Sequence, residues 1–215
     1  MTAASQALGV FGGTFDPIHV AHLAVAEAAR DALGLERVLF MPNRQPPHKP
    51  DQAVTPAADR LAMVEAAVAG NPAFETSTIE IDRDGPSYTA DTLAALREQR
   101  LAAGESGDLA LIVSVEAVAG LATWHEPARV LSLAQLVVAP RDGYADVDPA
   151  AIARLVPGAN PRIVVLDGPR MRLSASEIRA RAAVGRSLRY LVPDAVAAYI
   201  GDHALYQDSG RIDRS

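Results

Sequence analysis

The chain has 215 residues, which is long enough for one large domain with an α/β core. It contains no cysteine, so disulfide bonds and thiolate chemistry are excluded. A formal net charge of −6 and a pI near 5.3 argue against a polyanionic partner such as DNA or RNA, but they are compatible with a local cationic pocket for a small phosphate ligand. The N-terminus has no basic region and no apolar run reaches transmembrane length, so we expect a cytoplasmic protein without a membrane partner. A homo-oligomer is one of the forms that the sequence leaves open.

The first predicted element is a buried strand, formed by the apolar run Ala7 to Phe11. Gly12 and Gly13 end this strand, and because neither carries a Cβ atom the backbone can turn sharply and approach a ligand. An Ala-rich helix follows over Val20–Leu33, and Gly34 ends it. The two glycines lack the spacing of a dinucleotide-binding loop and the lysine of a P-loop, so alone they could be a plain strand-to-helix turn.

Two histidines lie at the start of this helix. His19 and His22 share one face of its first turn, where unpaired N–H groups and the positive end of the helix dipole attract anions. They could also be half-buried histidines without a chemical role, or a metal pair. Metal-binding histidines on a helix are more often four residues apart, however, and no third ligand is evident nearby. Together with the preceding strand and glycines, the pair favours a triphosphate site.

The rest of the chain alternates apolar runs with helical patterns, as a doubly wound parallel sheet requires. We expect an α/β, Rossmann-like fold with helices on both faces of the sheet, in a single domain over residues 1–206. A polar, frayed tail is expected over residues 207–215. Further strands are predicted over Arg37–Pro42, Phe74–Ile81, Leu109–Val113, Gln135–Ala139 and Arg162–Leu166. Further helices are predicted from the N-cap Thr55 and the N1 residue Pro56 to about Ala69, and over Thr89–Arg100, Ala175–Val184 and about Pro193–His203.

The segment from Gly12 to His22 closely resembles the Gly-Gly-Thr-Phe-Asp-Pro-x-His-x-Gly-His signature of the nucleotidyltransferase superfamily. This resemblance implies that residues 1–206 form a nucleotidyltransferase domain in which the first residues of the signature bind the phosphates of ATP. Ala21 stands where the signature has its second-half glycine, and its methyl group is expected to crowd the place where the family's adenine packs. The phosphate-binding residues implied by the signature are Gly12, Gly13, Thr14 and Phe15.

Two segments resemble bacterial nicotinate-nucleotide adenylyltransferases in particular. One is Pro46-Pro47-His48-Lys49, which on its own reads as a surface loop stiffened by proline. The resemblance implies that His48 and Lys49 reach toward the phosphates from a mobile flap. The other is Pro86-Ser87-Tyr88-Thr89, otherwise a turn before a capped helix start, which implies that Tyr88 and Thr89 help hold the pyridine nucleotide. Backbone donors at a helix N-terminus suit a nicotinate carboxylate.

Trp124 is the only tryptophan, and core packing is the ordinary role of such a residue. The segment from Leu121 to Glu126 resembles the family's tryptophan-containing loop, whose indole lies against the nicotinate ring. An indole stacks well on a flat pyridinium. We therefore expect Trp124, the adjacent His125 and Asp16 to bind nicotinate mononucleotide. Asp16 is expected to position neighbouring groups rather than to act as a base.

The segment from Arg172 to Arg179 contains a capping box, since Glu177 lies three residues after Ser174. It also resembles the Ile-Ser-x-Thr/Ser-x-Ile-Arg motif that closes the ATP site across the superfamily. Both interpretations can hold together: the box fixes the start of the helix, and Ser176 and Arg179 then hold the β- and γ-phosphates.

One position departs from the family pattern. After the fourth strand the family usually has Gly-x-Asp along the adenosine ribose, and here the residues are Ser114, Val115 and Glu116. We expect Ser114 and Glu116 still to lie at the ATP site, with the serine side chain crowding the ribose. A nucleotide-binding sensor without turnover is the alternative that this departure suggests.

The resemblance implies an enzyme that joins ATP to nicotinate mononucleotide, giving nicotinate adenine dinucleotide and pyrophosphate. His19, His22 and Arg179 are then the catalytic residues, and Mg²⁺ enters with ATP, held by phosphates and water without a fixed protein site. The paired histidines alone would also fit a pantetheine-phosphate adenylyltransferase, a cytidylyltransferase or transfer to nicotinamide mononucleotide. The segments around Tyr88 and Trp124 favour the nicotinate acceptor.

Overall fold

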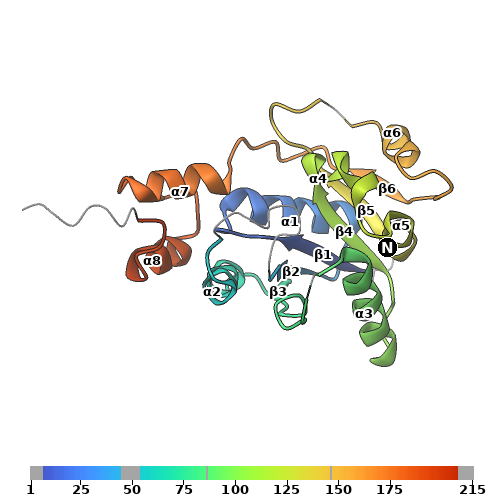
Figure 1. Ribbon diagram of the computed structural model, residues 1–215, viewed down its shortest axis with the longest axis horizontal. Coiled ribbons are helices and arrows are strands. Elements are labelled where there is room, and N and C mark those ends of the chain that lie inside the picture. The colour runs from blue at the N-terminus through green and yellow to red at the C-terminus, as the bar shows by residue number, and fades with distance from the viewer. Residues whose placement is uncertain (1–6, 45–53, 86, 146, 208–215) are drawn as a thin grey trace, which may run out of the picture.

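A six-stranded sheet in which all strands run parallel forms the centre of the molecule (Figure 1). The computed structural model describes residues 7–44, 54–85, 87–145 and 147–207. The strand order is β3-β2-β1-β4-β5-β6, so the chain first builds outward from β1 on one side and then, from β4 on, outward on the other. The strands are β1 (Leu8–Gly13), β2 (Arg37–Pro42), β3 (Phe74–Thr76), β4 (Leu109–Ser114), β5 (Gln135–Ala139) and β6 (Ile163–Val165).

Helices cover both faces of this sheet and make it a doubly wound α/β fold in one domain, as predicted. One face packs against α1 (Val20–Leu33), α2 (Ala57–Val68), α7 (Ala175–Ala183) and α8 (Asp194–Asp202). The other face packs against α3 (Thr89–Ala102), α4 (Val115–Ala119), α5 (Pro127–Leu133) and α6 (Pro149–Arg154), with a short 3-10 helix, η1 (Leu121–Thr123), between α4 and α5. In Figure 1, α7 and α8 lie together at one end of the molecule.

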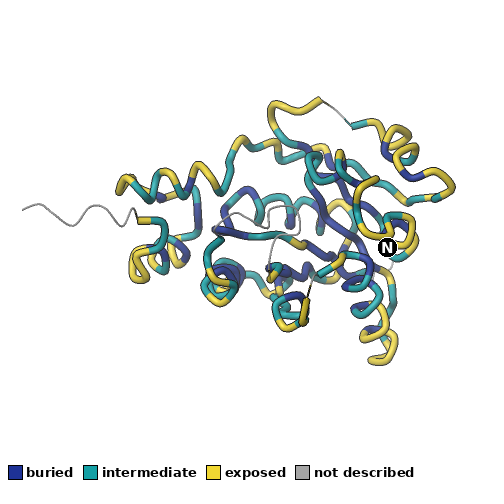
Figure 2. The backbone as a smooth tube through the Cα atoms, in the orientation of Figure 1, coloured by how far each residue is buried: buried dark blue, intermediate teal, exposed yellow. Residues whose placement is uncertain are grey.

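The strands alternate their side chains between two hydrophobic cores, as the period of two of a β-strand requires. In β4, Ala110 and Ile112 belong to the core under α1 and α2, whereas Leu109 and Leu111 belong to the core under α3 and α5. Figure 2 shows the central strands as a nearly continuous buried band. Because both faces are covered, the strands read in the sequence as continuous apolar runs, which is why they could be located there.

Several boundaries differ from the prediction by one or more residues. The first strand does not end at the glycines but continues through Gly13, paired with Pro42 of β2. β3 ends at Thr76 instead of Ile81, because the chain then turns: Ser77 Oγ accepts the Ile79 N–H group and Thr78 Oγ1 donates to Asp82. In helix α2, Pro56 rather than Thr55 occupies the N-cap position.

Three short helices were not predicted at all. They are α4, α5 and α6, which have 5, 7 and 6 residues respectively. A helix of two turns or less contains too few apolar positions to display the 3.6-residue period on which the prediction rests. They provide the crossover connections that return the chain to the amino end of the sheet.

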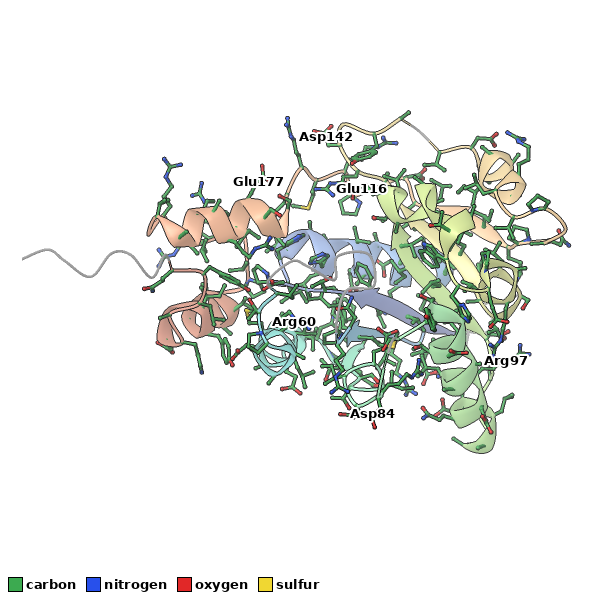
Figure 3. The ribbon with its side chains drawn as sticks, in the orientation of Figure 1. Arg60, Asp84, Arg97, Glu116, Asp142 and Glu177 are labelled. Carbon is green, nitrogen blue, oxygen red and sulfur yellow. The ribbon has the colours of Figure 1, made fainter. Side chains whose placement is uncertain are left out.

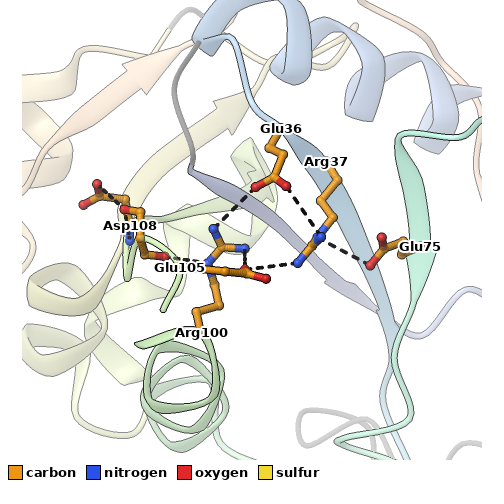
Figure 4. A network of polar contacts seen from close by, with 7 residues as sticks. Glu36, Arg37, Glu75, Arg100, Glu105 and Asp108 are labelled. Atoms are coloured by element: carbon orange, nitrogen blue, oxygen red, sulfur yellow. Dashed lines mark hydrogen bonds and ion pairs between the residues drawn. The ribbon is translucent and has the colours of Figure 1, made fainter. Parts of the chain in front are cut away.

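The amino ends of the strands carry an ion-pair network, remote from the edge where the loops after the strands gather (Figure 4). Arg100 is only 5% exposed and contacts Glu105 at 2.9 Å and Glu36 at 3.6 Å. Arg37 contacts the same Glu105 at 3.3 Å and Glu75 at 3.5 Å. The network joins the end of α3 to β2 and β3, so we assign it a structural role. Within the described residues, no helix has the length and apolar character needed to cross a bilayer.

Candidate active site

A cleft of about 1040 Å³ opens at the carboxyl ends of the strands. It lies where the strand order reverses between β1 and β4, the place where open α/β sheets bind ligands. All the predicted site residues that lie in the described segments line it, whereas His48 and Lys49 lie outside the described residues. Those lining the cleft are Gly12, Gly13, Thr14, Phe15, Asp16, His19, His22, Tyr88, Thr89, Ser114, Glu116, Trp124, His125, Ser176 and Arg179.

The end of β1 forms the floor of the cleft. A Cβ atom at Gly12 would meet nothing within 4 Å, so the missing side chain leaves open space for a ligand. A Cβ atom at Gly13 would lie 3.0 Å from the ring of Phe15, so a side chain at this position would press against that ring. Phe15 itself has φ 49°, a left-handed backbone that is uncommon for a residue with a bulky side chain. The sharp turn thus begins after the glycines and not at them.

His19 and His22 lie against each other where α1 begins. Their rings are stacked, with centroids 3.6 Å apart and an interplanar angle of 15°. His19 is the N-cap residue, and its backbone N–H group donates to Nδ1 of His22 at 3.2 Å. Since Nδ1 of His22 accepts this hydrogen bond, the neutral ring carries its proton on Nε2, which is therefore a donor.

Both imidazoles are neutral at pH 7 in this structure. Burial and the nearby Arg141 guanidinium lower the pKa of His19 to about 4. The pKa of His22 is lowered well below 6.5 by burial, then by His19 and Arg141. Edge-on contacts with the Phe11 and Phe15 rings, at 5.9 and 5.1 Å, supply apolar surroundings for His22. The pair therefore offers N–H donors rather than positive charge.

Arg141 is a cation of the cleft that the sequence analysis missed. Its Nη1 atom donates to Glu116 Oε1 at 2.7 Å, and Tyr144 donates to the same oxygen at 2.6 Å (Glu116 is labelled in Figure 3). The sequence contained a signal for this cation, because Arg141 closely follows the predicted strand Gln135–Ala139 and therefore lies at the carboxyl end of that strand. Glu116 is held by these two donors.

Ser114 ends β4 and begins α4. Its hydroxyl accepts the N–H group of Ala117 at 3.3 Å, which makes it the N-cap of α4. The oxygen expected to crowd a ribose thus already has a structural partner, although the residue lines the cleft.

The start of α7 also lines the cleft. The predicted capping box is present: Ser174 Oγ accepts the Glu177 N–H group at 3.2 Å, and Glu177 Oε2 accepts the Ser174 N–H group at 3.1 Å. Arg179 donates to Ser176 Oγ at 3.2 Å and to the backbone carbonyl of Asp16 at 2.7 Å. The helix start, one hydroxyl and one guanidinium are thereby fixed next to the β1 loop.

The residues predicted to hold the pyridine nucleotide come together from two segments, except Asp16, which lies in the loop after β1 next to Arg179. The rings of Tyr88 and His125 lie 4.1 Å apart at 30°, and Trp124 lines the same cleft, partly buried. Arg129 joins the segments, since it donates to Asp91 at 3.1 Å and to Glu126 at 2.7 Å. Trp124 is therefore at the edge of the core and in the cleft wall at once.

Glu80 is a second lining residue that the sequence analysis missed. It is 8% exposed, and its carboxyl accepts the Thr92 hydroxyl at 3.0 Å while its carbonyl accepts the Ser87 hydroxyl at 3.2 Å. Burial raises the pKa of this carboxyl. The contacts fix the start of α3, where the first N–H groups have no intrahelical partner.

No group of three or more His, Asp or Glu side chains that could hold a metal ion occurs among the described residues. Besides the carboxylates of Asp16, Glu80 and Glu116, the cleft is lined by hydrogen-bond donors, two arginines and aromatic rings. Such a set suits anionic phosphates and a flat heterocycle.

Comparisons with known proteins identify the family of this chain. The model of the cytidylyltransferase-like family matches residues 10–181. The chain is 47% identical over 203 residues to a probable nicotinate-nucleotide adenylyltransferase of Roseiflexus sp. (strain RS-1), covering 94% of this chain and 99% of the relative. It is 46% identical over 200 residues to the protein of that name from Thermomicrobium roseum, covering 93% of this chain and 91% of the relative.

A solved structure shares the fold at low identity. It is the Plasmodium falciparum nicotinic acid mononucleotide adenylyltransferase complexed with NaAD, with a TM-score of 0.75 and 16% identity, over 94% of this chain and 97% of that chain. The chain thus belongs to the cytidylyltransferase-like family and, within it, to the nicotinate-nucleotide adenylyltransferases.

Proposed function

We propose that the protein transfers the adenylyl group of ATP to nicotinate mononucleotide, giving nicotinate adenine dinucleotide and pyrophosphate in NAD biosynthesis. The observation that carries this proposal is that one cleft holds both the stacked pair of His19 and His22 and the aromatic wall of Tyr88, Trp124 and His125. The first set suits phosphates and the second suits a pyridine ring. The names of the relatives and the NaAD bound to the Plasmodium enzyme support the same substrates.

The chemistry requires little of the protein beyond alignment and charge. An oxygen of the acceptor's own phosphate, already anionic at pH 7, bonds to the α-phosphorus of ATP. The bond from that phosphorus to the bridging oxygen breaks, and pyrophosphate leaves with the electron pair. Because two anions must be brought together, orientation is the main contribution and can supply up to about 7–11 kcal/mol. Donors aimed at the developing charge supply the rest.

The geometry suggests a role for each phosphate-facing group. His19 and His22 donate N–H groups to the transferring α-phosphate, which they can do while neutral. Arg141 and Arg179 bring positive charge to the same cleft. Ser176 and the free N–H groups at the start of α7 hold the leaving pyrophosphate.

The part of the cleft formed by α3 and Trp124 can distinguish the carboxylate of nicotinate mononucleotide from the amide of nicotinamide mononucleotide. The first N–H groups of α3, beginning with that of Thr89, can donate to both oxygens of a nicotinate carboxylate. The indole of Trp124 then lies along the pyridinium ring and adds a cation–π contribution.

Mg²⁺ is proposed to enter with ATP. The two carboxylates of the phosphate end, Asp16 and Glu116, already accept hydrogen bonds from protein donors, so phosphate oxygens and water would be its main ligands. When bound, the ion neutralises part of the triphosphate charge.

A pyrophosphate-release assay with MgATP and one acceptor at a time tests the proposal. Nicotinate mononucleotide should support release, with nicotinate adenine dinucleotide formed in equal amount by chromatography. Release with pantetheine phosphate or cytidine substrates but not with nicotinate mononucleotide would contradict it. Binding of ATP without release for any acceptor would instead favour a nucleotide sensor.

A further inference from the structure

We propose that Tyr206 is a positioning residue of the adenylyl-transfer site, which it serves by holding Asp16 in the loop that leads to His19. This inference rests on the proposed function for its kinetic consequences, but the contacts that carry it are independent of the acceptor. Tyr206 lies after α8 and far from the signature segment in the sequence.

The contact is short and enclosed. The Tyr206 hydroxyl donates to Asp16 Oδ1 at 2.7 Å and joins residues that are 190 positions apart. Asp16 is 5% exposed, so few water molecules can replace this donor. Tyr206 has φ 64°, a left-handed backbone that costs energy for a residue with a side chain and persists only where the surroundings hold it. Burial and the Asp16 contact raise the pKa of the phenol, so it remains a donor at physiological pH.

Asp16 connects three further parts of the cleft. Its Oδ2 atom accepts the Thr55 N–H group at 3.3 Å, just before α2. Its backbone carbonyl accepts Nη1 of Arg179, from α7, at 2.7 Å. Asp16 itself lies three residues before His19, the N-cap of α1. A shift of Asp16 would therefore displace the phosphate-facing histidine and the arginine together.

The same loop is also held by Arg60 of α2, a fully buried residue labelled in Figure 3. Arg60 donates to the carbonyl of Thr14 at 2.7 Å, to that of Asn43 at 2.7 Å and to that of Thr55 at 2.9 Å. Arg60 thus fixes backbone carbonyls, whereas Tyr206 fixes the one carboxylate of the loop. With the phenol removed, Asp16 Oδ1 loses the Tyr206 donor and the loop loses this hydrogen bond to the segment after α8, whereas the contact with Arg179 of α7 remains.

The chain offers a matched control for this contact. Tyr199 donates to the Asp59 carboxylate at 2.9 Å and joins α8 to α2, but neither residue lines the cleft. Tyr206→Phe and Tyr199→Phe therefore remove the same group from the same kind of contact. In the full-length protein, the two variants should be compared for thermal midpoint, MgATP dissociation constant by calorimetry, and kcat with nicotinate mononucleotide.

We expect Tyr206→Phe to lower kcat by roughly 10-fold or more and to weaken MgATP binding, since a hydrogen bond to a charged group is lost and the phosphate loop shifts. Tyr199→Phe should leave kcat and the MgATP dissociation constant within about twofold of wild type, even if its thermal midpoint falls as much as that of Tyr206→Phe. In a double-mutant cycle, adding Tyr206→Phe to Asp16→Asn should cost far less than it costs the wild type.

Wild-type kcat and ATP affinity in Tyr206→Phe would overturn the proposal, and so would equal losses in the two phenylalanine variants or an additive cycle. If the wild type forms no product with nicotinate mononucleotide, the proposed function fails, and the MgATP dissociation constants still decide the role of Tyr206.

Discussion

The neutral histidine pair predicts a specific loss of stability in acid. In the folded protein the pKa of His19 is about 4, against 6.5 in its ordinary state, and the pKa of His22 is lowered in the same direction. Below pH 6.5 the unfolded chain therefore binds protons that the folded chain excludes. The free energy of unfolding must fall as the pH decreases from about 6.5 toward 4, and the contribution is fully present above that range.

The magnitude follows from the shift. For His19 it corresponds to about 3 kcal/mol in total, of which about 2 kcal/mol is lost between pH 6.5 and 5. A domain of this kind has about 5–15 kcal/mol of stability, so the effect is large enough to measure. Glu80, whose pKa is raised by burial, acts in the opposite direction, because its protonation favours the folded state.

Urea denaturation between pH 7.5 and 5 measures this loss, and variants separate the histidines from other groups. His19→Asn and His22→Asn in one chain should flatten the decline on the acid side, since both titrating groups are gone and all carboxylates remain. His203→Asn, which changes an exposed histidine outside the cleft, is the control variant. Parallel curves for the wild type and the double variant would refute the reasoning that burial keeps this pair neutral.

Three further predictions concern the phosphate end. His22→Ala should lower kcat by roughly 10²–10³ in a variant that still folds, as for loss of one transition-state donor, whereas His203→Ala should leave kcat unchanged. Near-native turnover in His22→Ala would remove its phosphate role. Arg141→Met should raise the ATP KM by about 10-fold, because it removes a cation and leaves the Glu116 carboxylate in the cleft with the Tyr144 hydroxyl as its remaining donor, and an unchanged KM would assign Arg141 to structure alone. Ser114→Gly should change the ATP KM by less than about twofold, because the hydroxyl caps α4; a markedly lower ATP KM would mean that the serine crowds the ribose after all.

The sequence predicted the fold well where an apolar or helical pattern extended over many residues, and it predicted the lining of the cleft well where a motif contained several lining residues. The continuous apolar runs of β1, β2, β4 and β5 and the 14-residue helix α1 could be located because burial on both faces and helical periodicity leave clear patterns. The topological switch then follows from the alternation of strands and helices. The short helices α4, α5 and α6 could not be found, because their few residues carry no period.

The sequence predicted which residues line the site, but not which other side chains they contact. Nothing local indicates that Arg141 would approach His19, that Glu116 would be bound by two donors, or that Tyr206 would reach Asp16 across 190 positions. These contacts depend on how the strand-end loops and the C-terminal segment meet in space. The neutral state of the histidines likewise depends on burial, which a single motif does not specify.

The ratio of kcat/KM for nicotinate mononucleotide to that for nicotinamide mononucleotide, at saturating MgATP, tests the central claim most directly. The carboxylate has two oxygens for the N–H donors at the start of α3, whereas the amide has one and turns its NH₂ group toward them. A hydrogen bond to a charged group contributes about 1.5–3 kcal/mol, so we predict a preference of roughly 10- to 150-fold for the acid. Equal efficiencies, or a preference for the amide, would contradict the assignment of nicotinate mononucleotide as the acceptor.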